Sequence, residues 1–597
     1  MMKRKCFMGT AIFFLCSLVT TSVAFAGPVK ATWADPSDGP HLVISGEETT
    51  LKAVAESESL NITYQWSYGD GTPDSGIQSV VDVPYTTSEP YGLEIAHTYT
   101  GKNNTQYTAT VTVWDNGVLL GTDTYTVKIK NGSGNIRKKI GIEMGLWYIH
   151  KEISREPWLG APTAWINRDW DEGAIMSTQT FIDAGFLATG SPDNPYTDNV
   201  QRMVNSVTSF LGIMSVADKD LYSAEDRVAG PAGMIDGLGV YLTFDNETEF
   251  GFGPALKLIA TAGYDAAATP VVWDDSLNFT GDPAVSLGNW TYHQIAQQMV
   301  DWIAWAQVVG CSNDYYMRNG STPSKVCDPV NYPVESYSRG GWPFWVEGWG
   351  VIKEGNTYHE NRGDGTFSDA SLTNWTLSGV MAAEANLGLV YPDYLKPEAQ
   401  NFLLANLGSE GEVKFGAGQY IKDIGRAGMG LTMMSWMGLP VDDVNVQAQK
   451  NFISNNWNYD NWNTDQYYQE YDTNCDWNPV AAGNINCYSH FSNTETIEMF
   501  YYVRFYNPDG TIGYERVSDG VYQRINILAI RNIAEGLNSY TWSAPVPAPE
   551  MDLLTYQERY VDLLLLNQHD NGSWHDNNWG WTDIAGTGWA VQALLRL

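Results

Sequence analysis

The chain has 597 residues, of which 34 are basic and 69 acidic, so its formal net charge at pH 7 is −35. This excess of negative charge excludes nucleic acid as a partner and disfavours polyanionic ligands. Neutral glycans, cationic polymers, metal ions and other proteins are left, and a 13% content of Phe, Trp and Tyr provides many aromatic surfaces for contact.

The first 26 residues are expected to direct export. A basic start, Lys3-Arg4-Lys5, precedes an apolar run from Cys6 to Val23, and Ala24-Phe25-Ala26 fits a signal-peptidase site. Without those three basic residues, 31 basic residues oppose 69 acidic ones and the mature charge is −38. No later apolar stretch reaches about 18 residues, so we expect no membrane span in the mature chain and predict a secreted, periplasmic or cell-surface protein.

Residues 29–130 alternate β-forming residues with turns. The clearest runs are Tyr107 to Trp114 and Thr124 to Ile129. The pattern predicts a β-sandwich of about one hundred residues. A linker at 131–139, which contains the flexible sequence Asn131-Gly132-Ser133-Gly134-Asn135, is expected to follow it.

Two motifs in this region carry a resemblance. Tyr64-Gln65-Trp66-Ser67-Tyr68-Gly69-Asp70-Gly71 resembles the Trp-x-Phe-Gly-Asp-Gly signature of polycystic kidney disease (PKD) domains, with Tyr68 in place of Phe, and Ala96-His97-Thr98-Tyr99 resembles their second signature. The resemblance implies an immunoglobulin-like sandwich that serves as a spacer or adhesive unit. It also implies that Asp70 is a structural residue.

Beyond residue 140 the pattern becomes helical. Six stretches share one design, in which an acidic residue is followed by a helix rich in small residues or Met and then by a Gly or polar turn; they begin at Glu172, Glu249, Asp369, Asp423, Glu495 and Asp583. The first five run to Gly190, Gly263, Gly388, Gly438 and Gly510. Amphipathic segments between them, such as 292–308 and 397–407, suit an outer layer. Six helical hairpins are therefore expected.

The last hairpin carries the most specific motif. Gln568 to Trp574 reads Gln-x-x-x-Gly-x-Trp, and a helix with Gly586 and Gly588 follows. This arrangement resembles the repeat of the squalene cyclase and protein prenyltransferase superfamily, whose hairpins close into an α/α toroid. The predicted fold class is therefore a multidomain chain, with an N-terminal Ig-like (PKD) β-sandwich and a C-terminal all-α (α/α)6 toroid at 140–597. Gln568 is expected to bond backbone groups of adjacent helices.

The cysteines of the mature chain fall into two close pairs. An oxidising compartment favours the disulfides Cys311–Cys327 and Cys475–Cys487. A zinc site is the competing hypothesis, because prenyltransferases hold zinc with an Asp, a Cys and a His, and similar ligands occur here as Cys475, Asp476, Cys487 and His490.

Calcium is the cofactor that the sequence leaves open. Asp472, Asn474 and Asp476 imitate the first half of a calcium loop, but Trp477 stands where Gly is needed. No other cofactor is indicated.

Carboxylates at the starts of the inner helices are the catalytic candidates, namely Asp171, Glu172, Asp369 and Asp423. In a closed toroid all inner helices begin at one rim, so these side chains would surround the cavity mouth and could supply paired carboxyls for acid–base hydrolysis. Helix capping is the alternative role, because the first turn of a helix favours a carboxylate.

Tryptophans in loops are the candidates for substrate binding, namely Trp342, Trp345, Trp462, Trp579 and Trp581. Flat aromatic faces beside Asn and Asp provide the stacking and edge hydrogen bonds that sugar rings need. Packing between hairpins is the alternative role for each ring.

Together these features predict a secreted or surface protein that binds or degrades an extracellular glycan or similar polymer. As an enzyme it would be a glycoside hydrolase or a polysaccharide lyase, and a lyase would draw its base from Tyr148 and His150 or from Asn486, Tyr488 and His490. The alternative is a non-catalytic adhesion module that binds a surface protein or glycan. Asp169-Trp170-Asp171-Glu172 is similar to the acidic motif of squalene-type cyclases and keeps a terpenoid cyclase or prenyltransferase as a third hypothesis.

Overall fold

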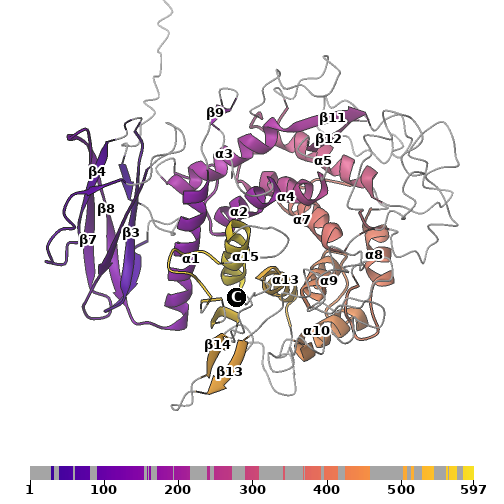
Figure 1. Ribbon diagram of the computed structural model, residues 1–597. Coiled ribbons are helices and arrows are strands. Elements are labelled where there is room, and N and C mark those ends of the chain that lie inside the picture. The colour runs from indigo at the N-terminus through magenta and orange to yellow at the C-terminus, as the bar shows by residue number, and fades with distance from the viewer. Residues whose placement is uncertain are drawn as a thin grey trace, which may run out of the picture.

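The structure is a computed structural model, shown in Figure 1. It describes residues 29–31, 39–57, 59, 61–80, 91–153, 157–158, 161–162, 171–191, 194–215, 238–242, 248–271, 290–307, 340–342, 368, 370–391, 395–414, 424–456, 502–506, 512–516, 527–542, 560–562, 564–565, 567–574 and 583–597. The expected signal segment 1–26 lies outside these residues.

The N-terminal part consists of two sheets that share one core. Its strands are β1 (Val29–Ala31), β2 (His41–Ile44), β3 (Glu48–Ala55), β4 (Ile62–Ser67), β5 (Gln78–Ser79), β6 (Tyr91–Thr98), β7 (Gln106–Asp115) and β8 (Val118–Lys130). The order is β1-β3-β6 in one sheet and β2-β8-β7-β4-β5 in the other. Alternate residues point inward, as Ile62, Tyr64 and Trp66 do on β4, because successive side chains of a strand face opposite sides.

The two sheets are joined at an edge. The Ala31 N–H on β1 donates to Asp123 Oδ2 on β8 at 2.7 Å, which links the smaller sheet to the larger one. In the larger sheet β2 runs parallel to β8. The strands therefore curl into a half-barrel rather than forming two separate layers.

The two motifs of this part pack against each other. The Tyr68 ring stacks on His97, with ring centroids 3.6 Å apart, and His97 Nε2 lies 2.8 Å from Asp70 Oδ2. Gly69 has a φ of 72°, and a Cβ there would lie 2.2 Å from the Thr108 carbonyl oxygen. These contacts give Asp70 the structural role that the sequence predicted.

Helices dominate the rest of the chain. Their bounds are α1 (Gly134–Glu152), α2 (Asp171–Asp183), α3 (Pro195–Ser209), α4 (Thr248–Thr261), α5 (Tyr292–Ala306), α7 (Ala370–Leu387), α8 (Leu395–Ala405), α9 (Ile424–Trp436), α10 (Val444–Asn456), α13 (Ile527–Asn538) and α15 (Asp583–Arg596). Three antiparallel strand pairs accompany them: β9 (Pro157–Trp158) with β10 (Ala161–Pro162), β11 (Leu211–Ser215) with β12 (Leu238–Leu242), and β13 (Tyr502–Tyr506) with β14 (Ile512–Arg516).

Six of these helices form a closed ring, visible in Figure 1. Each contacts the next in the order α2, α4, α7, α9, α13, α15, and α15 returns to α2. The others pack outside, with α1 against α15, α3 against α2, α5 against α4, and α8 and α10 against α9. Long-range contacts therefore join the two ends of the helical part.

Glycines set the separation of the ring helices. A Cβ at Gly253 of α4 would lie 2.2 Å from the Trp375 carbonyl oxygen of α7, and one at Gly428 of α9 would lie 2.5 Å from the Asn532 carbonyl oxygen of α13. A Cβ at Gly588 of α15 would lie 3.2 Å from the Ser177 Cα of α2. Side chains at these points would force the helices apart.

Two turns on the outside of the ring repeat one set of hydrogen bonds. The Gln568 amide donates to the carbonyl oxygens of Gly572 (3.1 Å) and of Gly141 on α1 (2.9 Å). Gln307 donates likewise to the carbonyl oxygens of Gly340 (2.8 Å) and of Leu395 on α8 (3.0 Å). The predicted role of Gln568 is confirmed, and Gln307 is a second copy that the sequence did not reveal.

The predicted fold class, an immunoglobulin-like sandwich followed by an all-α (α/α)6 toroid, is wrong. The N-terminal sheets are joined as a curled half-barrel, and strand pairs interrupt the helical part, so the chain is a mixed structure. Alternation along one strand does not show which edges meet, because edge pairing depends on residues far apart in the sequence. Also, α1 begins at Gly134, inside the segment 131–139 expected to be a linker.

The half-barrel packs directly on α1. The Lys52 ammonium donates to Glu143 Oε1 at 2.8 Å, and His41 Nδ1 lies 2.7 Å from the same oxygen. Trp147 Nε1 donates to the Glu94 carboxylate, and Val54 of β3 belongs to the same buried cluster as the core of the ring. The contact is therefore a buried, charged interface and not a flexible tether.

Candidate functional site

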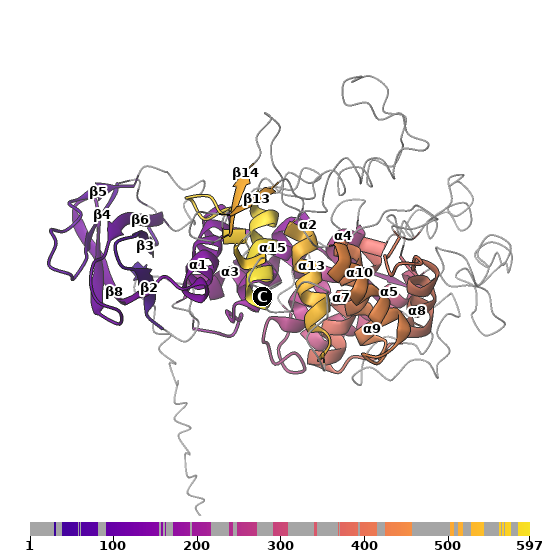
Figure 2. The same cartoon turned by 90° about the horizontal axis from the view of Figure 1, so that it is seen from below.

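The ring helices have a common direction. Contacts near or just beyond their carboxyl ends join neighbours: Asn538 with Arg596 (2.8 Å), Arg596 with Asp183 (3.0 Å), Ala188 with Ala262 (2.9 Å), Ser435 with Ser539 (2.9 Å) and Trp436 with Glu384 (2.6 Å). Figure 2 shows the C-terminus at the lower end of α15. The amino ends therefore share the opposite rim, which we call the N-terminal rim.

Several predicted carboxylates belong to the N-terminal rim. Asp171 and Glu172 form the start of α2, Glu249 lies in the first turn of α4, and Asp583 is the first residue of α15. Asp369 and Asp423 lie outside the described residues, and each immediately precedes in sequence the first residue of a ring helix, α7 or α9. The positive ends of the helix dipoles favour carboxylates at this rim.

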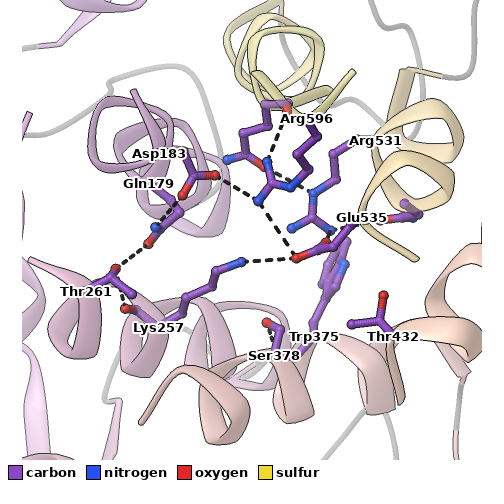
Figure 3. Close-up of polar contacts among 12 residues, drawn as sticks. Gln179, Asp183, Lys257, Thr261, Trp375, Ser378, Thr432, Arg531, Glu535 and Arg596 are labelled. Atoms are coloured by element: carbon purple, nitrogen blue, oxygen red, sulfur yellow. Dashed lines mark hydrogen bonds and ion pairs between the residues drawn. The ribbon is translucent and has the colours of Figure 1, made fainter. Parts of the chain in front are cut away.

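Below the N-terminal rim, five charged side chains from four ring helices meet in an ion network (Figure 3). Glu535 of α13 is its centre, with Arg531 at 2.8 Å, Lys257 at 3.6 Å and Arg596 at 3.8 Å. Arg596 also lies 3.0 Å from Asp183. The network ties α2, α4, α13 and α15 together across the space that the six ring helices enclose, which we call the bore.

The carboxylates of the ion network are held in the charged form. Burial alone would raise the pKa of Glu535, but Arg531, Lys257 and Arg596 outweigh it and hold that pKa well below its usual range. Burial would also raise the pKa of Asp183, and Arg596 and Lys257 lower it. In contrast, burial lowers the pKa of Lys257, an effect that Glu535 only partly opposes.

A small cavity adjoins the ion network, at mid-depth in the ring. Its volume is about 30 Å³, and it is lined by Met176, Gln179, Pro254, Lys257, Trp375, Ser378, Arg531, Trp589 and Gln592. A water needs about 10–15 Å³ of such space, so the cavity has room for one or two water-sized groups. We call it the bore cavity.

Of the predicted tryptophans, Trp342 is described and it is buried. Its side chain is 1% exposed, its Nε1–H donates to the Ile303 carbonyl oxygen at 2.9 Å, and its N–H donates to Thr373 Oγ1 at 3.1 Å. Trp574 makes the equivalent bonds in the repeated turn, to Leu564 (2.6 Å) and Thr587 (3.0 Å). The prediction of a sugar platform at Trp342 is thus corrected to a packing role, because a buried ring offers no face to a ligand.

Apart from Tyr148 and His150, the other predicted site residues lie outside the described part of the chain. These are Trp345, Trp462, Trp579 and Trp581, the cysteines Cys311, Cys327, Cys475 and Cys487, the zinc and calcium candidates from Asp472 to His490, and the base candidates Asn486, Tyr488 and His490. Within the described part, no group of three or more His, Cys, Asp or Glu side chains is arranged to hold a metal ion.

His150, a candidate base, is a core residue. It is 3% exposed, its Nδ1 lies 2.9 Å from Asn199 Nδ2, and its ring stacks on Trp147 with centroids 5.1 Å apart. No solvent-facing surface is left for proton transfer to a polymer.

The sequence missed the ion network. Its signal is nevertheless present, because Lys257 stands alone in the apolar run Ala255-Leu256-Lys257-Leu258-Ile259, and Arg531 and Glu535 stand four apart among apolar residues of α13. A charge inside an apolar helix is expensive to bury unless it meets a partner. Such charges could have been identified as mutually paired.

Comparison with known proteins leaves the family open. No protein-family model and no curated protein matches the chain. Among solved structures it is similar to a family 76 glycoside hydrolase from a bovine Bacteroides thetaiotaomicron strain, with 8% sequence identity, 95% of this chain and 98% of that chain covered, and a TM-score of 0.38. A likeness at this level assigns neither a family nor an activity. None of the described helices has the length and apolarity that crossing a bilayer requires.

Proposed function

We propose that this is an exported protein that binds or degrades an extracellular glycan at the N-terminal rim of its helix ring. The observation that carries the proposal is the common direction of the ring helices, which gathers the starts of α2, α4 and α15 and their acidic residues on one side. The net charge of −35 favours a neutral glycan over an acidic one.

The N-terminal rim is a better candidate than the bore. Ligand pockets usually measure about 300–1,000 Å³, whereas the bore cavity measures about 30 Å³. The ion network lies directly beside this cavity, so a sugar ring would have to break buried ion pairs to enter. The ring therefore acts as a bowl with a charged floor.

Hydrolysis would use two carboxyls of the rim. One, protonated, would donate its proton to the glycosidic oxygen while the other, ionised, would activate water or attack the anomeric carbon. Neighbouring helices pack at about 8–10 Å, and the two groups need a separation of about 5–10 Å. Asp171 and Glu172 on α2 could pair with Asp583 on α15, because α2 and α15 are in contact through Gly588.

Glycan binding without catalysis is the second candidate. The observation that favours it is the position of the same carboxylates in the first turns of helices, where the helix dipole alone accounts for them. In that case the bowl would recognise a glycan through loop aromatics, and Trp345, Trp462, Trp579 and Trp581 remain the candidates.

The test uses protein lacking residues 1–26 and a panel of neutral and acidic polysaccharides, with and without calcium. Reducing ends and the absorbance of unsaturated products are measured separately, because the first alone indicates hydrolysis and the second a lyase. Asp171→Asn, Glu172→Gln, Asp369→Asn and Asp423→Asn follow. Loss of a catalytic acid or base should lower kcat about 10²–10⁴-fold.

Asp198→Asn is the matched control, because Asp198 lies in the first turn of α3, outside the ring. It should leave activity unchanged. Absence of products together with retention on one immobilised glycan would select the binding candidate. If no polysaccharide of the panel gives products and none retains the protein, the proposal is overturned.

A further inference from the structure

Lys257 has few partners for a buried ammonium group. In the described part of the chain its only ion pair is with Glu535 at 3.6 Å, and its side chain is 14% exposed. An ammonium carries three donors, and Lys257 is one of the residues that line the bore cavity.

Arg531 is the second cation of this wall. Its Nε donates to Gln592 at 3.1 Å, and its Nη1 donates to Asn532 at 2.8 Å and pairs with Glu535 at the same distance. Within the residues that the structure describes, no bond is made by Nη2. Within that part of the chain, both cations that line the bore cavity thus have donors without a protein partner.

Among the residues that the structure describes, the charges of the ion network do not balance. Lys257, Arg531 and Arg596 carry three positive charges, whereas Asp183 and Glu535 carry two negative ones. Arg596 and Asp183 are the last residues of their helices, where helix dipoles favour cations. The cavity lies deeper, beside mid-helix residues such as Gln179 and Trp589, and the dipole effect falls off within a turn.

We propose that the bore cavity binds one small monovalent inorganic anion, of the size of chloride, held by Lys257 Nζ and the Arg531 guanidinium. A volume of about 30 Å³ accommodates a monatomic ion and no sugar. Water would satisfy the donors but would leave the surplus positive charge buried, which is costly. An anion would supply both an acceptor for these donors and a compensating negative charge.

The first test compares thermal unfolding in sodium chloride and sodium gluconate at equal ionic strength. Chloride should raise Tm in a saturable way, by about 1 °C for each tenfold increase above its Kd for a chain of this length unfolding as one unit. The ³⁵Cl NMR line should be broadened by the protein and should narrow when bromide competes. Because the protein is strongly acidic, non-specific chloride binding is small.

Lys257→Met is the decisive variant, because it leaves two cations facing two carboxylates. It should lose both the chloride dependence of Tm and the line broadening, and in gluconate it should be at least as stable as the wild type. Lys396→Met is the control, since Lys396 lies on α8 outside the ring, with Glu384 at 3.9 Å, and it should keep both effects.

Equal Tm values in chloride and gluconate, together with no excess line width for the wild type, would overturn the proposal and leave water in the cavity. Full retention of the broadening by Lys257→Met would also overturn it. If that variant does not fold, the bromide competition on the wild type still shows whether the protein has a specific anion site. None of these measurements depends on a glycan. A negative result here would therefore leave the proposed function untouched, and the reverse also holds.

Discussion

Glu535 is the residue that makes the ion network possible, because it is the shared partner of three cations. Glu535→Gln would leave three buried positive charges opposite Asp183 alone. Breaking a buried pair by removing one partner costs about 3–5 kcal/mol, and we expect a loss of that size in the free energy of unfolding, measured with denaturant.

The control for this substitution is Glu47→Gln. Glu47 pairs with Arg137 at 2.6 Å, but both side chains are close to half exposed, so its loss should cost no more than about 1 kcal/mol. Equal effects of the two substitutions would contradict the central role of Glu535.

The pH dependence of stability follows from the same residue. The pKa of Glu535 is lowered in the folded state, so its stabilising effect is complete above its ordinary pKa of 4.5 and is lost as the pH falls below it. Between pH 7 and pH 3 the wild type should therefore lose more stability than Glu535→Gln, as measured by denaturation at each pH. If the wild type and Glu535→Gln lost the same free energy of unfolding between pH 7 and pH 3, this pH dependence could not be assigned to Glu535.

At the scale of elements, crossings at glycine hold the ring together. Gly428→Ala would place a Cβ 2.5 Å from the Asn532 carbonyl oxygen, so α9 and α13 would have to separate. Overpacking of this kind costs about 1–3 kcal/mol, and denaturant unfolding should show the loss. Gly134→Ala, at the start of α1 with no atom within 4 Å of the new Cβ, should be neutral or slightly stabilising. Equal midpoints for the two variants would argue against a tight crossing.

The element pattern shows how far the sequence could predict the fold. Gly263, Gly388 and Gly438 were expected to end ring helices, and each follows one with a positive φ, because glycine is the least strained residue there. For α2 the turn is Gly185 instead of Gly190. The strand pairs such as β11–β12 were missed, because residues 216–237 separate their partners and no local pattern specifies such a pairing.

Only those features of the candidate site that a short stretch of sequence determines could be predicted. Acids at helix starts follow from capping preferences, which a short stretch of sequence contains. The ion network joins Asp183 to Arg596, 413 positions apart, and Trp342 sits in a turn whose Gln307 precedes it by 35 positions. Neither relation has a signature in a short stretch of sequence. The ion network was therefore missed, and Trp342 was interpreted as a sugar-binding platform.

At the scale of the molecule, the half-barrel and the ring share a buried ion pair. Burial alone would raise the pKa of Glu143, but His41 and Lys52 lower it to about 2. This stabilisation is present above the ordinary pKa of 4.5 and is lost as the pH falls towards about 2. Acid should therefore weaken the contact between the half-barrel and α1 while the packing within each of the two parts is still intact.

Glu143→Gln tests this interface at neutral pH. It would leave Lys52 buried without its partner, at a cost of about 3–5 kcal/mol, and should speed protease cleavage at residues 131–133 between β8 and α1. Lys151→Met removes the more exposed pair with Glu94, whose atoms are 2.9 Å apart, and should leave the cleavage rate near that of the wild type. Unchanged cleavage of Glu143→Gln would mean that the apolar contacts suffice.

Closure of the ring also constrains the order in which the molecule can form. The seam between α2 and α15 is made by bonds such as Ser177 with Ile584 and Gln592 with Met176, whose partners are 407 and 416 positions apart. Contacts of such separation form slowly, because chain entropy must be lost first. Until α15 is in place, the preceding ring helices are an open arc with an uncovered α2 edge, so we expect a nascent chain to be most prone to aggregation in the interval before α15 packs.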